Sequence, residues 1–418
     1  MLMISPRLKV NSERLLTNFE ELAMIGATRA GGVSRVALSN DDLAARSWFA
    51  ERVEKAGFTV RDDEAGNLSG VLRCARANAR TLLIGSHLDT TPNGGRYDGS
   101  VGVLAGLECL QTIQDEGIEL PFNLEVIDFT DEEGQWQSLF GSMGLTGALR
   151  DEHINDSRTD NAAFRAALFR AGLIASEVRA ARRDPHSLVG YLELHIEQSD
   201  FLERSQREIG IVTRIVGRSS FRITFTGEAV HAATNFAKKR DALQGAASFI
   251  TGLHQMPHEI EGGMVNCGNL VVQPGKVTIV PAAVSIDMEV RHADEHQLDL
   301  MEARTAELAQ ACARDYQLGV AVERVLHRDV AYMDERFQQH IETVCAEQGY
   351  SCMRLISLAG HDAQILAPFT PSAMIFIPCK NGISMNPSEY TDWQNVENGA
   401  NVLLHTVLKL AADYDPAL

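Results

Sequence analysis

The spacing of hydrophobic residues predicts two helices early in the chain, followed by strands that alternate with helices. Apolar residues recur at helical spacing over residues 12–24 and 40–56. Short apolar runs typical of strands follow at 58–61, 68–73, 81–86 and 124–130. A helical pattern at about 100–115 separates the last two runs. This order favours a mainly parallel α/β sheet, whose ligands bind beyond the carboxyl ends of the strands.

After residue 210 the pattern changes to strict alternation of apolar and polar residues, as in SSFRITFTGE and AVSIDMEVRH. Alternation is typical of an antiparallel sheet with one packed and one solvated face. Helical segments near 238–253 and 294–315 accompany these strands, and a strand at 372–378 and a helix near 392–412 then resume the first pattern. We therefore predict a first domain interrupted by an α+β domain of one antiparallel sheet and two helices, with parts at 1–212, 213–329 and 330–418.

Composition and charge narrow the possible functions. The chain has 418 residues, of which 45% are hydrophobic and 22% charged, as in ordinary globular proteins. Lys and Arg number 38 against 56 Asp and Glu, and the net charge of −18 has the wrong sign for binding nucleic acid or an anionic membrane. The seven cysteines form no C-x-x-C pair, and we find neither a signal peptide nor an apolar run of about 18 residues. We expect a cytoplasmic protein with free thiols.

The segment GSHLDTTPNGGRYDGSVG, residues 85–102, combines metal-ligand side chains with a glycine-rich loop. His87 and Asp89 stand two residues apart beyond an apolar run, so on an extended backbone they point the same way, and Asp98 follows the loop. Imidazole and carboxylate groups bind zinc or manganese, and Asp89 suits the carboxylate that holds the second ring nitrogen of a ligating histidine. The alternative interpretation is a polar strand end with a solvated turn.

Three carboxylates, Asp131, Glu132 and Glu133, directly follow the apolar run at 124–130. Adjacent like charges raise one another's pKa values and cost stability unless a cation or a proton-transfer role holds them there. On this interpretation one carboxylate is a metal ligand and another a general base. The alternative is an acidic helix start, stabilised by the helix dipole.

The segment GYLELHIEQ, residues 190–198, places Glu193, His195 and Glu197 on one face of a strand. On its own, a histidine on the polar face of a strand indicates a surface residue more often than a ligand. Three polar strand ends that supply His, Asp, Glu and His together contain the ligand set of a metal-assisted hydrolase. In such an enzyme the metal activates water and a carboxylate moves protons.

Seven segments in a recognisable order carry a resemblance to a known family. They are GATRAGGVSRVALSNDDLAAR, GSHLDTTPNGGRYDG, DEEG, YLELHIEQ, GEAVHAAT, EVRH and AGHDA, spread between about residues 10 and 400. Together they resemble the family of N-carbamoyl-L-amino acid hydrolase, β-ureidopropionase and allantoate amidohydrolase. The resemblance covers nearly the whole chain.

The resemblance implies a catalytic domain like that of dinuclear zinc aminopeptidases, a lid domain through which two chains form a homodimer, and cleavage of a ureido or amide C–N bond. By position, His87 and His195 resemble ligands of the two metals, and Asp98 resembles the bridging carboxylate. Glu133 resembles a further ligand. Glu132 resembles the general base that takes a proton from water and passes it to the leaving nitrogen.

The same resemblance implies substrate contacts. His231 resembles the histidine that reaches the partner's site and stabilises the developing oxyanion. Gln198 and Arg291 match substrate-binding positions, and Arg291 suits a bidentate grip on a carboxylate. Without the resemblance, His231 is an ordinary loop histidine and Arg291 a solvated charge.

The chain departs from the family near the predicted metals and substrate. The family motif GISH-x-P-x-E reads GISMNPSE here, so Met385 stands where a histidine completes the second metal site. A thioether is a poor ligand for zinc or manganese beside carboxylates, so we expect one or two ions per chain, the second only if another group such as His361 replaces the histidine. His361 is otherwise a neighbour of the ligands or a substrate contact. Thr278 replaces an asparagine that usually binds substrate.

Three functional hypotheses stay open. The first is a metal-dependent amidohydrolase that cleaves a C–N bond of a small N-carbamoyl or N-acyl amino acid or of an allantoate-like ureido acid. The second is a diverged paralogue with a mononuclear site of His87, Asp98 and His195 and a different small carboxylate substrate. The third is a non-catalytic ligand-binding protein that keeps the fold. The retained acidic pair and His195 favour the two enzyme hypotheses.

Overall fold

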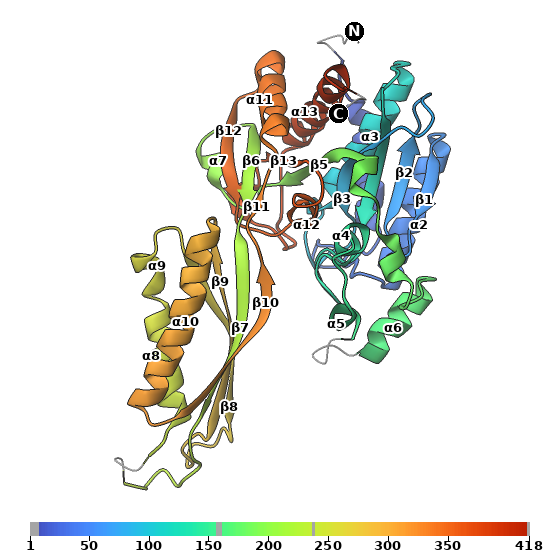
Figure 1. Cartoon of the computed structure of the whole chain (residues 1–418). Helices are drawn as coiled ribbons and strands as arrows, with labels where there is room; N and C mark the ends of the chain where they lie inside the picture. Colours follow the sequence, from blue (N-terminus) through green and yellow to red (C-terminus); the bar gives the residue numbers. More distant parts are fainter. Residues whose placement is uncertain (1–7, 156–160, 236–238, 416–418) are drawn as a thin grey trace. The chain divides into compact units, whose positions relative to one another are not determined.

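The computed structural model describes the following parts of the chain (Figure 1): residues 8–155, 161–235 and 239–415. The chain divides into two compact units, one of residues 1–213 with 332–418 and one of residues 214–331. The first unit is built on a large, mainly parallel sheet and the second on an antiparallel sheet. The predicted fold class is confirmed.

Within the described residues, nine strands form the sheet of the first unit. Their bounds are β1 Thr59–Asp62, β2 Leu68–Leu72, β3 Thr81–His87, β4 Asn123–Phe129, β5 Leu188–Ile196, β6 Ile209–Ile215, β11 Ala331–Tyr332, β12 Cys352–Ser357 and β13 Ser372–Ile377. The order is β1-β2-β4-β3-β5-β13-β6-β11, with β12 paired to β6. Strands β4, β3, β5 and β13 pair in parallel, so their carboxyl ends meet at one edge of the sheet.

Helices pack on this sheet. Their bounds are α1 Ser12–Met24, α2 Asn40–Lys55, α3 Ser100–Asp115, α4 Phe140–Thr146, α5 Asp151–Ile154, α6 Asn161–Arg170, α7 Phe201–Arg204, α11 Glu335–Gln348, α12 Asp362–Leu366 and α13 Trp393–Ala412, with 3-10 turns η1 Val178–Ala181, η2 Pro185–Ser187 and η4 Lys380–Gly382. The main apolar core lies between the sheet and α1, α2, α3, α11 and α13. A second core joins α4 and α6.

Strand β5 lies in the middle of the sheet, between β3 and β13, and each of its residues is buried. Leu192 and Leu194 belong to the main apolar core. Because side chains alternate along a strand, Glu193 and His195 point to the opposite face. There the buried Glu193 accepts a hydrogen bond from the N–H of Ala363, in α12. A surface position for His195 is therefore wrong.

The second unit has four antiparallel strands in the order β10-β7-β9-β8. Its elements are β7 Gly217–Thr226, α8 Ala242–Leu253, α9 Met256–Glu259, β8 Met264–Gln273, β9 Ala283–His292, α10 Glu295–Asp315 and β10 Gly319–Arg328. Burial alternates strictly along β7 and β9, and their apolar side chains share a core with α8 and α10, which lie side by side in Figure 1. Helix α8 begins where Asp241 accepts a hydrogen bond from the N–H of Leu243, whereas position 238 of the predicted helix lies outside the described residues.

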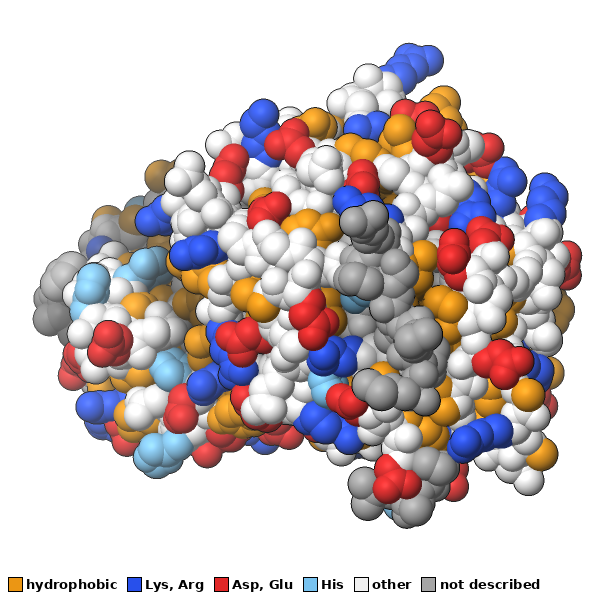
Figure 2. All heavy atoms as spheres, turned by 90° about the horizontal axis from the view of Figure 1, so that it is seen from above, with side chains coloured by type: hydrophobic (Ala, Val, Ile, Leu, Met, Phe, Trp, Pro, Cys, Tyr) orange, Lys and Arg blue, Asp and Glu red, His pale blue; other side chains and the backbone are white. Residues whose placement is uncertain are grey.

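The structure shows how apolar helices and charged side chains are distributed. Among the described residues, no helix combines the length and apolarity needed to cross a membrane. Acidic and basic side chains are interspersed over the face seen in Figure 2.

Candidate metal centre

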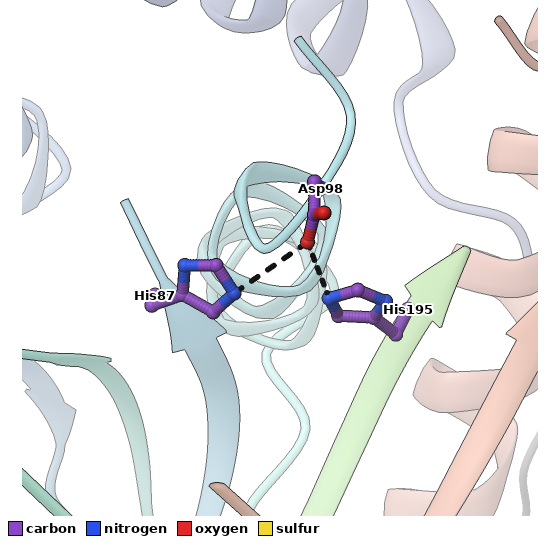
Figure 3. Close-up of side chains that lie close together, drawn as sticks. All are labelled: His87, Asp98 and His195. Carbon is purple, nitrogen blue, oxygen red and sulfur yellow. Dashed lines mark ion pairs between the residues drawn. The ribbon is translucent and has the colours of Figure 1, made fainter. Parts of the chain in front are cut away.

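His87, Asp98 and His195 come together where the central strands end (Figure 3). His87 is the last residue of β3, His195 is the last but one of β5, and Asp98 lies in the loop before α3. One ligand atom of each lies within 4.8 Å of the other two, and all three residues are buried. Asp98 Oδ1 lies 3.6 Å from His87 Nε2 and 3.1 Å from His195 Nε2. A solvated turn at Asp98 is therefore wrong.

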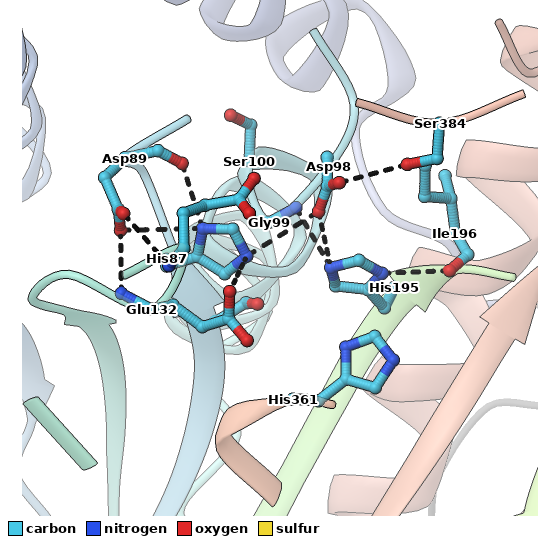
Figure 4. A network of polar contacts seen from close by, with 12 residues as sticks. His87, Asp89, Asp98, Gly99, Ser100, Glu132, His195, Ile196, His361 and Ser384 are labelled. Carbon is cyan, nitrogen blue, oxygen red and sulfur yellow. Dashed lines mark hydrogen bonds and ion pairs between the residues drawn. The ribbon is translucent and has the colours of Figure 1, made fainter. Parts of the chain in front are cut away.

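Each imidazole is oriented by a backbone carbonyl (Figure 4). His87 Nδ1 lies 3.0 Å from the oxygen of Asp89, and His195 Nδ1 lies 2.9 Å from the oxygen of Ile196. A ring nitrogen beside a carbonyl oxygen carries the proton, so in the neutral rings both Nε2 atoms direct lone pairs toward Asp98 Oδ1. Two lone pairs and a carboxylate oxygen that face one another are suited to share a cation, and the N–H of Gly99 also lies 3.1 Å from His195 Nε2. Histidines that bind metals usually donate their other N–H in this way.

Burial and mutual contact shift the pKa values of all three groups. Burial raises the pKa of Asp98, but the hydrogen bond and charge of His195, together with His87, outweigh burial and hold this pKa well below its usual range. Burial lowers the pKa of His195, whereas the hydrogen bond to Asp98 raises it, with a net result of about 9. Burial lowers the pKa of His87 to about 4. Asp98 is thus an anion paired with His195, whose Nε2 must give up its proton before it can bind a metal.

The loop that carries Asp98 is braced by a residue that the sequence did not single out, Glu389. The buried Glu389 Oε1 accepts hydrogen bonds from the N–H groups of Tyr97 and Asp98, at 2.8 and 3.1 Å. Gly95 lies directly against this carboxylate, since a Cβ atom there would be 1.9 Å from Glu389 Cδ. Glu389 is the last residue of the quoted motif GISMNPSE, but the motif alone does not indicate that its carboxylate binds the loop of Asp98.

Replacing Gly95 by Ala is expected to displace Glu389 and to loosen Asp98. We expect the affinity for a divalent ion to fall by about 10–100-fold, as for other residues that orient metal ligands. Isothermal titration with Zn²⁺ measures this change. The control is Gly268→Ala in β8, where a Cβ would have no neighbour closer than 3.8 Å. Wild-type affinity in the Gly95→Ala protein would contradict the bracing role of Glu389.

Asp131 organises the turn after β4. Its two carboxylate oxygens accept hydrogen bonds from the N–H groups of Gln135, Trp136 and Gln137. Its backbone has φ +55°, and the next helix, α4, begins only at Phe140. An acidic helix start at residues 131–133 is therefore wrong.

Glu132 and Glu133 follow Asp131 beside the group of three. Glu132 Oε2 lies 3.7 Å from His87 Nε2, and both Glu132 and Glu133 lie outside the group of three. Asp89 holds both residues, because its oxygens accept their backbone N–H groups at 3.2 Å. Its carboxylate lies 3.6 Å from His87 Nδ1, so the backbone oxygen of Asp89 is the nearer partner of that ring. Burial, and then neighbouring negative charge, raises the pKa values of Glu132 and Glu133 well above their usual range.

A fully buried arginine, Arg35, supports the end of β3. Its Nε donates to the backbone oxygen of Leu88 at 2.9 Å and its Nη2 to Ser100 Oγ at 2.8 Å. The backbone oxygen of Arg35 accepts the N–H of Thr90 at 2.9 Å. Arg35 belongs to the quoted segment GGVSRVALS, but nothing in the sequence indicates that it lies under the site.

Three further predicted residues of the first unit surround the group. Gln198 Nε2 donates to Asp98 Oδ2 at 2.9 Å. The buried ring of His361 lies with its centroid 4.5 Å from that of His195, and Met385 is 47% exposed. His361 and Met385 both lie outside the group of three.

His231, Thr278 and Arg291 belong to the second unit. His231 and Thr278 are exposed neighbours, because the N–H of Ala232 donates to the oxygen of Thr278 at 2.8 Å. Arg291, on β9, is half-buried and its Nε donates to Glu289 Oε1 at 2.9 Å. The substrate roles of these residues stay predictions.

Comparison with known proteins decides the family. Peptidase family M20/M25/M40 matches residues 83–409. The chain belongs to this family. It is 33% identical over 405 residues to an N-carbamoyl-L-amino acid amidohydrolase of Geobacillus stearothermophilus, a match that covers 96% of this chain and 99% of that protein. The family predicted from the motifs is thereby confirmed.

Other M20 relatives agree in sequence and in structure. An allantoate amidohydrolase of Bacillus subtilis (strain 168) is 29% identical over 412 residues, covering 96% of this chain and 99% of that protein. The crystal structure of a hydantoinase/carbamoylase family amidase from Burkholderia multivorans matches with a TM-score of 0.84 at 33% identity, covering 97% and 98% of the two chains. M20 proteins are metal-dependent, and two imidazole nitrogens with one carboxylate oxygen fit a divalent cation.

Proposed function

We propose that this chain is a metal-dependent amidohydrolase that cleaves a C–N bond of a small N-carbamoyl or N-acyl amino acid or of an allantoate-like ureido acid. We assign zinc or manganese to His87, Asp98 and His195. One observation carries the proposal: two histidine Nε2 atoms converge on one carboxylate oxygen, while both Nδ1 atoms face backbone carbonyls. Three protein ligands with an open position are typical of catalytic metal sites, whereas structural sites are closed by a fourth ligand.

The chemistry divides between the ion and Glu132. A divalent ion bound there would polarise the substrate carbonyl and make water more acidic. Glu132, beside His87, takes one proton from the water that attacks the carbonyl carbon and delivers it to the nitrogen as the C–N bond breaks. Its raised pKa suits this role, because the carboxyl must hold the proton between the two steps.

Gln198 offers an acceptor for the substrate. Its Nε2 donates to Asp98, but its buried Oε1 accepts no hydrogen bond from any described residue. A buried acceptor without a donor costs free energy, and the N–H of a ureido or carbamoyl group supplies that donor. We assign binding of the substrate carboxylate to Arg291. Its guanidinium must then give up its hydrogen bond to Glu289. We also assign stabilisation of the developing oxyanion to His231, and contacts with the substrate to Thr278 and His361.

We also propose a homodimer formed through the second unit. Strand β8 is an edge strand of its sheet and carries the exposed residues Leu270 and Val271. An exposed apolar edge is suited to pairing with a second copy. Light scattering that gives the monomer mass would refute the dimer.

The seven free cysteines support a reducing compartment such as the cytoplasm.

The test of the activity is ammonia or amine release from a panel of N-carbamoyl amino acids, N-acyl amino acids and allantoate. We expect turnover of at least one compound by protein loaded with zinc or manganese. A chelator should abolish this turnover, and either ion should restore it. No turnover of any compound by the loaded protein would refute the proposal.

A further inference from the structure

We propose that this site holds one divalent ion per chain, because Met385 leaves a second ion without a nitrogen ligand, while Gln198 and Ser384 hydrogen-bond with the oxygen of Asp98 that this ion would need. The inference rests on the proposed metal-dependent function and specifies its site. The resemblance to dinuclear aminopeptidases implies two ions. The residues of this chain fit one.

The first argument concerns the second oxygen of Asp98. A carboxylate that bridges two ions uses both oxygens, and here Oδ1 faces the two histidines. Oδ2 instead accepts a hydrogen bond from Gln198 Nε2 at 2.9 Å. It also lies 3.0 Å from Ser384 Oγ (Figure 4). Gln198 Nε2 also donates to Ser384 Oγ, at 3.1 Å. Two neutral side chains, of which Gln198 donates to Oδ2, therefore lie on the side of Asp98 on which a second ion would bind.

The second argument concerns Glu389, whose two carboxylate oxygens both accept hydrogen bonds. Its Oε1 accepts two loop N–H groups. Its Oε2 accepts the N–H of Met385 at 3.1 Å and lies 3.0 Å from Ser384 Oγ. The Ser384 hydroxyl has one proton, so it donates to Glu389 or to Asp98 and links the two carboxylates. Glu389 is thus a brace of the loop, and a metal bound to it would have to displace one of these hydrogen bonds.

The third argument is the shortage of ligands. Met385 is 47% exposed, and its thioether binds zinc or manganese poorly beside carboxylates. The Nε2 of His361 lies 3.1 Å from Ser357 Oγ, so a metal bound to this nitrogen would have to displace that contact. Among the predicted ligands this leaves Glu133. A second ion would then have two protein ligands, Glu133 and an oxygen of Asp98 that is already hydrogen-bonded. Two are too few for a tight site.

Metal stoichiometry tests the inference without reference to activity. The full-length protein is loaded with excess Zn²⁺ or, separately, Mn²⁺, freed of unbound ion by gel filtration, and analysed by plasma mass spectrometry. We expect about one ion per chain for the wild type and for the control Met385→Leu. We expect about two for Met385→His, since an imidazole at this position adds the missing nitrogen ligand. Histidine tolerates the left-handed backbone at residue 385, where φ is +54°.

The outcomes separate the two proposals. Two ions in the wild type would overturn the inference and leave the proposed function intact, whereas no ion would overturn both. One ion in the wild type but also in folded Met385→His would overturn the assignment of the missing site to Met385. The wild-type value decides the number of ions even if the histidine variant fails to fold.

Discussion

Replacing Glu132 by Gln is expected to lower kcat by about 10²–10⁴-fold while the protein stays folded and keeps its metal. The amide has nearly the shape of the carboxylate but cannot take a proton from water. Glu132 lies 3.7 Å from His87 Nε2 and outside the group of three ligands, so its change should leave metal content intact. Steady-state kinetics on the best substrate, with metal analysis of the same sample, measures both effects.

The control for loss of a carboxylate charge is Glu116→Gln, at an exposed position at the end of α3, which should show wild-type kinetics. An unchanged kcat in the Glu132→Gln protein would remove Glu132 from the role of base. A parallel loss of metal would instead show that Glu132 is a ligand.

Replacing His195 by Ala is expected to remove the ion and, with it, turnover. The change deletes one of three ligands, so we expect metal affinity to fall by more than about 100-fold, beyond the loss usual for residues that only orient ligands. Calorimetric titration with Zn²⁺ and ammonia-release assays measure the two losses.

His405→Ala controls for the removal of a buried histidine remote from the site. His405 is 7% exposed and its Nε2 contacts the backbone oxygen of Leu8 at 2.8 Å, so its loss should lower the free energy of unfolding but spare the metal. Wild-type metal affinity in a folded His195→Ala protein would refute the ligand assignment.

Local patterns predicted the sheet because each strand around the site is marked by its own apolar run. The runs at 81–86 and 124–130 became β3 and β4, and polar residues beyond them met at one edge, as parallel pairing requires. Strand β5 was harder, since its alternating polar residues indicate a half-exposed strand. It is buried on both faces because Glu193 finds partners in Ser86 and the N–H of Ala363, which the sequence does not reveal.

The supports of the site escaped prediction because they act across long stretches of chain. Arg35 reaches Ser100, and Glu389 caps the N–H groups of Tyr97 and Asp98 nearly three hundred positions away. Such pairs have no local pattern, and only the fold brings them together. The resemblance singled out His87, Asp98 and His195, whose side chains do converge, while their role as ligands stays a proposal.

The pairing of β5 with β3 has a consequence for the life of the protein in the cell. His87 and Asp98 are near in sequence, but His195 joins them only when these two strands pair, so the proposed ion would bind the assembled sheet far better than the unfolded chain. At an ion concentration of 100 times the Kd, such binding adds about 2.7 kcal/mol to the free energy of unfolding. Chains made during metal scarcity would therefore unfold more often and be degraded faster. We expect the abundance of this protein to follow the supply of its metal.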